Sequence, residues 1–205
     1  MLNGQNIRAS LFNVVSSCPN FRSVGVEMRK AWYAPAAPAA KAYHDAGHVV
    51  VAYVFGGQVR RGGVRTGTLA HVSQHPNFVI ANVCVLMAGY LAEEKYQGHH
   101  WLWDDDVIRE LHALRSGHNE DVSLRGNPTD LRAIAQLISD DGPSMPLADA
   151  SHLIAQCRQQ TAALLDEQPV WIGVEQIAEA LLRNRFLSPS FVKNILDTEF
   201  RQLSL

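Results

Sequence analysis

Two histidines four positions apart, His44 and His48, are the residues of this sequence best placed to do chemistry. They lie in the segment KAYHDAGHVV (residues 41–50), and on an α-helix such a pair shares one face, about 5–6 Å apart. Two imidazoles at that spacing can bind one metal ion, and Asp45 adds a carboxylate that could accept a proton from water. Chance also supplies H-x-x-x-H pairs, so two ordinary core histidines are the alternative interpretation.

The element that carries the pair favours the metal-binding interpretation. Apolar residues flank both histidines over about residues 39–55, and the pattern predicts a helix that stops at Gly56-Gly57. Ala46 and Gly47 lie between the histidines, and such small residues would let another backbone pack closely on this turn.

A second pair with the same spacing, His71 and His75, lies in a segment where apolar and polar residues alternate. In an extended strand, two residues four positions apart are separated by about 13 Å, which is too far for both to bind one ion. We therefore interpret these two as ordinary surface or strand histidines.

The composition is that of a globular protein with a sizeable core. Of 205 residues, 47% are hydrophobic and 19% are charged, and the net charge of −2 gives no basis for binding nucleic acid. The apolar runs are too short for a membrane span. The N-terminus lacks the basic start and apolar run of a signal peptide, so secretion is not expected. The three cysteines are far apart and form no C-x-x-C motif, so we expect neither a disulfide framework nor a cysteine zinc site, and we expect a cytoplasmic protein.

The expected fold is mainly α-helical with one small β element. Residues 1–35 show little periodicity and are interpreted as an N-terminal extension of unknown role, ahead of one domain over residues 36–205. Glycines and alternating apolar residues predict a hairpin or edge strands over residues 58–75, where the segment 67–74 could bind a peptide by strand addition. Further helices are predicted at about residues 77–96, 104–115, 127–138, 147–166, 174–185 and 190–196.

The polar segment HHWLWDDD (residues 99–106) places two histidines and three aspartates around two tryptophans. It could form a second metal site or a lid over the domain. We favour a solvated loop whose tryptophans cover the domain, because that is the commoner role of such a segment.

Four segments of the chain, in order, resemble the FtsH-type zinc metallopeptidases, the protease half of membrane AAA+ proteases. AYHDAGHVVVAYVFGG resembles the A-Y-H-E-A-G-H-A helix of that family, and VLMAGYLAEEKYQG resembles its L-x-G-G-R-x-A-E-E-x-x-x-G signature. GNPTDLRAIAQLI is similar to its G-A-x-N-D-L-x-x-A-T segment, and residues 162–196 follow the pattern of its closing helices. The resemblance spans about residues 39–197 and is far more specific than a histidine pair alone.

This resemblance implies a zinc site assembled from separate helices. By position, its ligands are His44, His48 and Asp130, and three protein ligands leave a fourth position for water. From its surroundings alone, Asp130 is a residue of the helix start, at the third helical position after the Asn127 cap, where a carboxylate suits the helix dipole. The two roles are compatible.

Two acidic residues beside these ligands, Asp45 and Glu93, have expected roles. The family's general base is a glutamate, and here the position holds Asp45, which is one methylene or about 1.5 Å shorter. Of the pair Glu93 and Glu94, we expect Glu93 to accept a hydrogen bond from a ligand histidine and to fix its tautomer. The alternative for both glutamates is a solvated acidic pair at a helix end.

The function that the resemblance implies is a zinc-dependent endopeptidase that cleaves flexible or unfolded polypeptides, with Asp45 as the base. The alternative is a catalytically impaired module that keeps metal or peptide binding, which Asp45 favours, and a plain helical interaction domain is a third. The sequence departs from the family at Ala88-Gly89-Tyr90, which replaces G-G-R, and over residues 99–125, which lengthen a short link. No G-x-x-x-x-G-K-[ST] motif occurs, so an unfoldase would be a separate AAA+ ATPase. A homo-oligomer is also compatible with the sequence.

Overall fold

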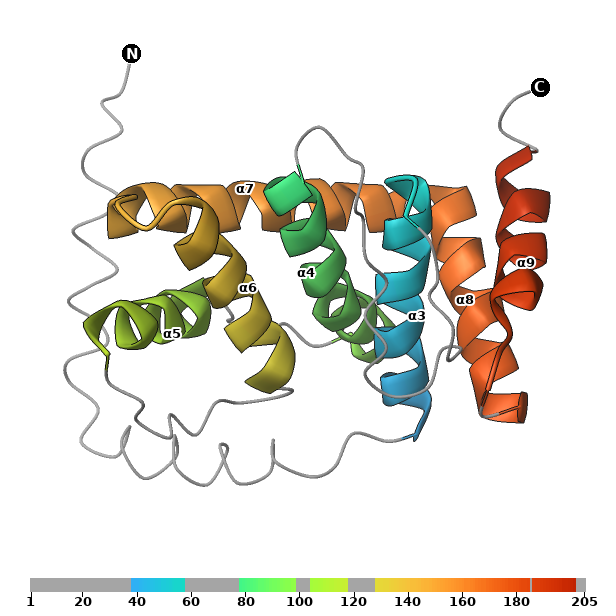
Figure 1. Ribbon diagram of the computed structural model, residues 1–205. Coiled ribbons are helices and arrows are strands. Elements are labelled where there is room, and N and C mark those ends of the chain that lie inside the picture. The colour runs from blue at the N-terminus through green and yellow to red at the C-terminus, as the bar shows by residue number, and fades with distance from the viewer. Residues whose placement is uncertain (1–37, 58–77, 99–103, 118–127, 185, 202–205) are drawn as a thin grey trace, which may run out of the picture. The chain divides into compact units, whose positions relative to one another are not determined.

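The computed structural model describes residues 38–57, 78–98, 104–117, 128–184 and 186–201. The chain divides between Pro35 and Ala36 into two units, and every described residue lies in the second. The described part consists of seven helices and contains no strand, so its class is mainly α (Figure 1). The predicted β element at residues 58–75 lies outside the described residues. The helices are α3 (Pro38–Val54), α4 (Phe78–Gln97), α5 (Asp104–Ser116), α6 (Pro128–Asp141), α7 (Leu147–Asp166), α8 (Gln168–Asn184) and α9 (Pro189–Arg201).

The helix ends follow the signals in the sequence. Gly56 and Gly98 adopt positive φ values of 74° and 69°, the left-handed conformation that closes α3 and α4. The Gly98 N–H donates to the Glu94 carbonyl at 2.8 Å, which satisfies a carbonyl of the last turn. At the start of α9, the Ser188 hydroxyl accepts the Phe191 N–H at 3.2 Å, as an N-cap does.

Helix α8 begins earlier than the sequence pattern predicts. The apolar periodicity predicts a helix from about residue 174, whereas α8 begins at Gln168. Pro169 lies in the first turn, where its missing N–H has no helical partner to lose. Glu167 has an extended backbone and separates α7 from α8, and its carbonyl accepts the Trp171 N–H at 3.0 Å.

Helix α3 packs between α4 and α8, and α4 also contacts α6 and α7 (Figure 1). Residues 81–92 of α4 are all buried, so this helix forms the centre of the fold rather than an amphipathic outer layer. No described helix is both long and apolar enough to cross a membrane. The largest fully buried side chains are Leu111, Leu131, Ile134, Ile138, Ile154, Leu165, Ile177, Leu196, Val49, Val50 and Val51.

The contact between α3 and α4 is close because both helices present small residues. A Cβ added to Gly47 would lie 2.3 Å from the Ala88 carbonyl oxygen and 2.8 Å from the Ala92 Cβ. Only glycine therefore fits at this position without moving a backbone. This close approach brings the histidine face of α3 directly onto α4.

Candidate metal centre

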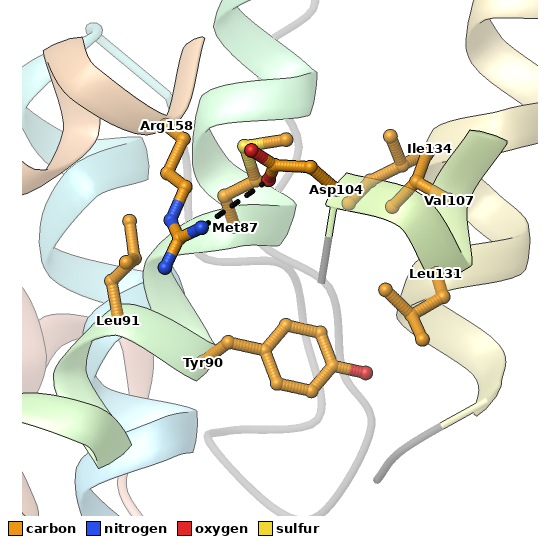
Figure 2. A pocket seen from close by; sticks show the side chains of 8 residues that line it. All are labelled: Met87, Tyr90, Leu91, Asp104, Val107, Leu131, Ile134 and Arg158. Atoms are coloured by element: carbon orange, nitrogen blue, oxygen red, sulfur yellow. Dashed lines mark ion pairs between the residues drawn. The ribbon is translucent and has the colours of Figure 1, made fainter. Parts of the chain in front are cut away.

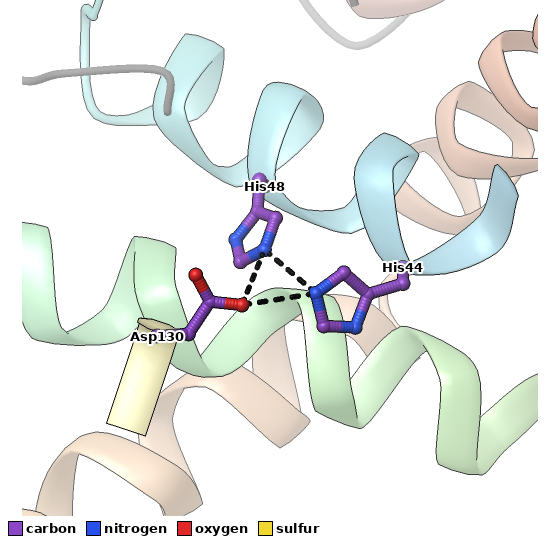
Figure 3. A group of neighbouring side chains, drawn as sticks. All are labelled: His44, His48 and Asp130. Atoms are coloured by element: carbon purple, nitrogen blue, oxygen red, sulfur yellow. Dashed lines mark hydrogen bonds and ion pairs between the residues drawn. The ribbon is translucent and has the colours of Figure 1, made fainter. Parts of the chain in front are cut away.

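Three buried polar side chains converge where the start of α6 meets α3 (Figure 3). His44 and His48 lie one turn apart on α3, and each is 6% exposed. Their Nε2 atoms are 3.1 Å apart. Asp130, in the first turn of α6, places Oδ2 3.0 Å from Nε2 of His44 and 3.5 Å from Nε2 of His48. The fold therefore brings together two histidines and an aspartate that is 86 positions from His44 in the chain.

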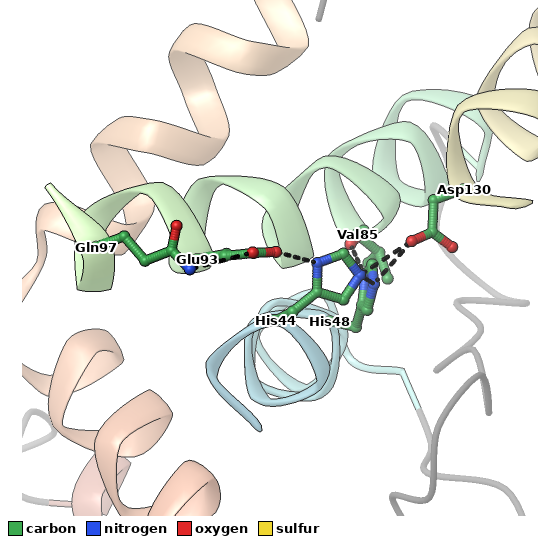
Figure 4. Close-up of polar contacts among 6 residues, drawn as sticks. All are labelled: His44, His48, Val85, Glu93, Gln97 and Asp130. Carbon is green, nitrogen blue, oxygen red and sulfur yellow. Dashed lines mark hydrogen bonds and ion pairs between the residues drawn. The ribbon is translucent and has the colours of Figure 1, made fainter. Parts of the chain in front are cut away.

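The other ring nitrogen of each histidine faces an acceptor, and this orients both rings (Figure 4). Nδ1 of His48 donates to the Val85 carbonyl at 2.7 Å. Nδ1 of His44 lies 3.4 Å from Oε2 of Glu93, and Oε1 of Glu93 accepts a hydrogen bond from Gln97 at 3.4 Å. With Nδ1 protonated in each ring, the Nε2 lone pairs point toward each other and toward Asp130.

Nε2 of His44, Nε2 of His48 and Oδ2 of Asp130 form a triangle whose size fits a metal ion. Ligand atoms about 2.0–2.1 Å from a tetrahedral ion lie about 3.3–3.4 Å from one another. The three separations of 3.1, 3.0 and 3.5 Å bracket that value. Two imidazole nitrogens and one carboxylate oxygen are also a donor set that Zn²⁺ and several other divalent ions accept. A buried His44–His48–Asp130 group that could hold a metal ion is thus present.

The pKa values of the triangle show that it favours a positive charge. Burial alone lowers the pKa of His44, but hydrogen bonds to Asp130 and Glu93 outweigh burial and raise it from 6.5 to about 9. Burial alone raises the pKa of Asp130, but hydrogen bonds from both histidines hold it well below its ordinary value. A bound cation would displace the proton of His44 and would supply the positive charge in its place.

Asp45 directly follows His44 in α3 and is partly buried. Its pKa is raised, first by burial and also by the charge of Asp130, while the charges of His44, Lys41 and His48 act in the opposite direction. The Asp45 carboxylate therefore interacts electrostatically with His44, His48 and Asp130. A carboxyl group with a raised pKa holds a proton more readily than an ordinary aspartate, as a general base in a hydrolytic site must.

Two residues of α4 complete the site, and in the sequence they stand out only as a departure from the family's G-G-R and not as site residues. A Cβ on Gly89 would lie 2.4 Å from Nε2 of His48 and 2.8 Å from Nε2 of His44, so a glycine forms the floor of the triangle. The Tyr90 ring meets the His44 ring edge-on, with the ring centres 5.1 Å apart. A glycine in the middle of a buried helix was the available signal, because that position costs helix stability.

The remaining predicted polar residues lie elsewhere. Glu94 faces Arg158 at 3.7 Å rather than a histidine, so Glu93 is the member of the acidic pair that meets His44. The pair His71 and His75 lies outside the described residues, as does the HHWLW part of the segment 99–106. Asp104, Asp105 and Asp106 form the first turn of α5. Within the described ranges, the triangle is the one group of three potential ligands close enough to share an ion.

Comparison of the chain with protein-family models, with curated proteins and with solved structures finds no match in any of the three. The geometry of the triangle and the sequence pattern around it therefore carry the functional argument.

Proposed function

We propose that this chain is a zinc-dependent endopeptidase that hydrolyses flexible polypeptides, similar in its site to the FtsH-type metallopeptidases. The observation that carries the proposal is the buried triangle of His44, His48 and Asp130, with separations that suit a tetrahedral ion. The four ordered sequence segments add support, because His44, His48 and Asp130 occupy the ligand positions of that family. Flexible polypeptides are the substrates that the resemblance to that family implies.

In the proposed hydrolysis, His44 and His48 bind the metal ion and Asp45 transfers the proton. Zn²⁺, when bound, supplies a Lewis acid that polarises a peptide carbonyl and acidifies water. His44 and His48 provide neutral Nε2 donors, held in that tautomer by Glu93 and the Val85 carbonyl. A carboxylate oxygen of Asp45 takes the proton from the attacking water and passes it to the leaving amine nitrogen.

The second candidate function is a metal-binding or peptide-binding module with impaired turnover. The observation that favours it is Asp45, whose side chain is one methylene shorter than the glutamate of the H-E-x-x-H motif. A base that stops about 1.5 Å short of the water can cost a large factor in rate. The peptidase and the impaired module share the metal site and differ only in whether the Asp45 carboxylate reaches the proton of the attacking water.

Hydrolysis of a labelled unfolded protein such as casein separates the candidates. The zinc-loaded wild type is compared with His44→Ala as the blank, with Asp45→Asn, and with Asp45→Glu. We expect the wild type to cleave well above the blank and Asp45→Asn to lose about 10²-fold or more in rate, because a general base contributes about that much.

The contrary result is specific. If the wild type equals the His44→Ala blank while Asp45→Glu gains activity, the chain is the impaired module and the peptidase proposal is wrong. Zinc content measured on each sample ensures that a lost rate reflects the base rather than an empty site.

A further inference from the structure

The two histidines of the metal centre are oriented by hydrogen-bond partners of unequal strength. Nδ1 of His48 donates at 2.7 Å to the Val85 carbonyl, which belongs to the backbone of the buried helix α4. Nδ1 of His44 lies 3.4 Å from Oε2 of Glu93, which is longer than an ordinary hydrogen bond and ends on a flexible side chain. The torsion that turns an imidazole about its Cβ–Cγ bond has broad energy wells, so neighbouring atoms must fix the ring. His44 therefore needs a further contact to keep Nε2 directed into the triangle.

The ring of Tyr90 supplies such a contact. Its centre lies 5.1 Å from the centre of the His44 ring, and the angle between the two ring planes is 90°. The His48 ring meets the His44 ring edge-on as well, with the centres 4.7 Å apart. Aromatic rings at such distances prefer the edge-to-face arrangement, so a rotation of the His44 ring would disturb its packing against both neighbours.

Tyr90 is itself held firmly by the fold. It is 4% exposed, and its ring forms one wall of a small pocket bounded by side chains from α4, α5, α6 and α7 (Figure 2). Met87, Leu91 and Leu131 are apolar residues that line the same pocket. The space inside it is about 10 Å³, which is room for about one water molecule, so the ring has little space to move into. Tyr90 can therefore serve as a fixed wall for His44.

We propose that Tyr90 is a positioning residue of the metal centre, whose ring holds the His44 imidazole so that Nε2 faces the ion. The edge-to-face contact of the ring performs this role, and the hydroxyl does not. The proposal rests on the function proposed above, since it concerns the same metal centre. Tyrosine stands where the FtsH-type signature has arginine, so this way of orienting a ligand histidine is a property of this chain.

Metal binding by variants of Tyr90 tests the role of the ring without requiring peptide hydrolysis. Zinc affinity is measured by competition with a chromophoric chelator, and the visible absorption of the Co²⁺-loaded protein reports the coordination geometry. Tyr90→Leu removes the ring, and we expect zinc affinity to fall by about 10-fold and the Co²⁺ spectrum to change. Tyr90→Phe keeps the ring and removes only the hydroxyl, so its zinc affinity and Co²⁺ spectrum should equal those of the wild type.

Tyr53→Leu is the matched control for the loss of a tyrosine ring. Tyr53 is a partly buried tyrosine of α3 whose hydroxyl donates to Asp197 and whose ring contacts Phe200, and both partners belong to α9. The control should lose stability in urea, as Tyr90→Leu does, but should keep the zinc affinity and the Co²⁺ spectrum of the wild type. Tyr90→Met fills more of the space with a flexible chain and gives a second reading if Tyr90→Leu does not fold.

The outcomes distinguish this proposal from the peptidase proposal. Wild-type zinc affinity and an unchanged Co²⁺ spectrum in the folded Tyr90→Leu or Tyr90→Met variant overturn the positioning role, and so does an equal loss of affinity in Tyr90→Phe. An effect of the ring on metal binding without casein cleavage by the wild type leaves the positioning role standing and removes the peptidase function. Casein cleavage with unchanged metal binding in every Tyr90 variant does the reverse, and a wild type that binds neither metal overturns both.

Discussion

At the scale of single residues, the polar atoms around His44 form one continuous network. Gln97 donates to Glu93, Glu93 faces Nδ1 of His44, and Nε2 of His44 meets Asp130. A cation in the triangle and a proton on His44 compete for the same place, because both neutralise the buried carboxylates. The behaviour of the protein with pH follows from this competition.

The stability of protein stripped of metal by a chelator should fall as the pH rises from about 6.5 to 9. The folded pKa of His44 is about 9 against 6.5 in the unfolded chain, so its contribution is fully present below pH 6.5 and is lost as pH rises through 9. The contribution is about 3 kcal/mol, since one pKa unit is worth about 1.4 kcal/mol. Urea unfolding at several pH values measures it.

The control for this pH dependence is His44→Gln, which lacks the titrating group and should show a flatter profile over the same range. Apparent metal affinity should change in the opposite direction, rising with pH up to about 9, because the metal must displace the proton of His44. A metal-free wild type whose stability is constant from pH 6.5 to 9 would contradict the pKa assigned to His44.

Replacing Gly89 by alanine should remove metal binding. The added methyl group would lie 2.4 Å from Nε2 of His48 and 2.8 Å from Nε2 of His44, so both rings must move out of the triangle. We expect a loss of about 100-fold in metal affinity, the upper range for residues that orient ligands. Competition with a chromophoric chelator measures the affinity.

Gly173→Ala is the matched control, because this glycine also lies in a buried helix but its Cβ would come no closer than 3.2 Å to a leucine methyl. Its metal affinity should equal that of the wild type. If Gly89→Ala also binds metal like the wild type, the two rings do not hold the ion in the geometry described.

The sequence predicts part of this residue-scale picture. The spacing of His44 and His48 is a local helical property and is visible without a structure. The position of Asp130 beside them depends on how α6 packs, and the residues alone give it only a helix-start role. The role of Gly89 was not predicted, because the clash that a Cβ would make with the histidines of α3 depends on how the two helices pack.

At the scale of secondary-structure elements, the site depends on how closely α3 approaches α4. Gly47 makes this approach possible, since an added Cβ would lie 2.3 Å from the Ala88 carbonyl oxygen. Gly47→Ala should destabilise the fold by about 1–3 kcal/mol, the usual cost of overpacking, although alanine favours a helix. The free energy of unfolding in urea measures the effect, and an unchanged or increased value would contradict the close packing described.

The helices themselves are largely predictable, for local reasons. The predicted end of α3 at Gly56-Gly57 is confirmed, and Gly98 and Ser188 are equally local signals that close α4 and cap α9. The early start of α8 was not predicted because Pro169 looks like a helix breaker unless it is placed in a first turn. The packing of α3 between α4 and α8 depends on contacts far apart in sequence, which a periodic pattern does not encode.

At the scale of the whole molecule, a bound metal would join segments that are distant in the chain. His44 and Asp130 are 86 positions apart, so an ion between them stabilises the folded state and not the unfolded one. Zinc at a free concentration 100 times its Kd should stabilise the protein by about 2.7 kcal/mol. For a chain of this length, the melting temperature should rise by about 5–10 °C.

Differential scanning calorimetry with and without zinc measures this rise. The rise should disappear in Asp130→Ala and should reverse when a chelator is added to the wild type. An equal rise in Asp130→Ala would place the zinc at another site of the protein and would contradict the role of α6.

The measurement that tests the account most directly is anomalous diffraction at the zinc absorption edge from a crystal of the zinc-loaded protein. The account predicts one strong peak about 2.0–2.2 Å from Nε2 of His44, Nε2 of His48 and Oδ2 of Asp130. No peak between these three atoms, or a peak bound only by other residues, would contradict it.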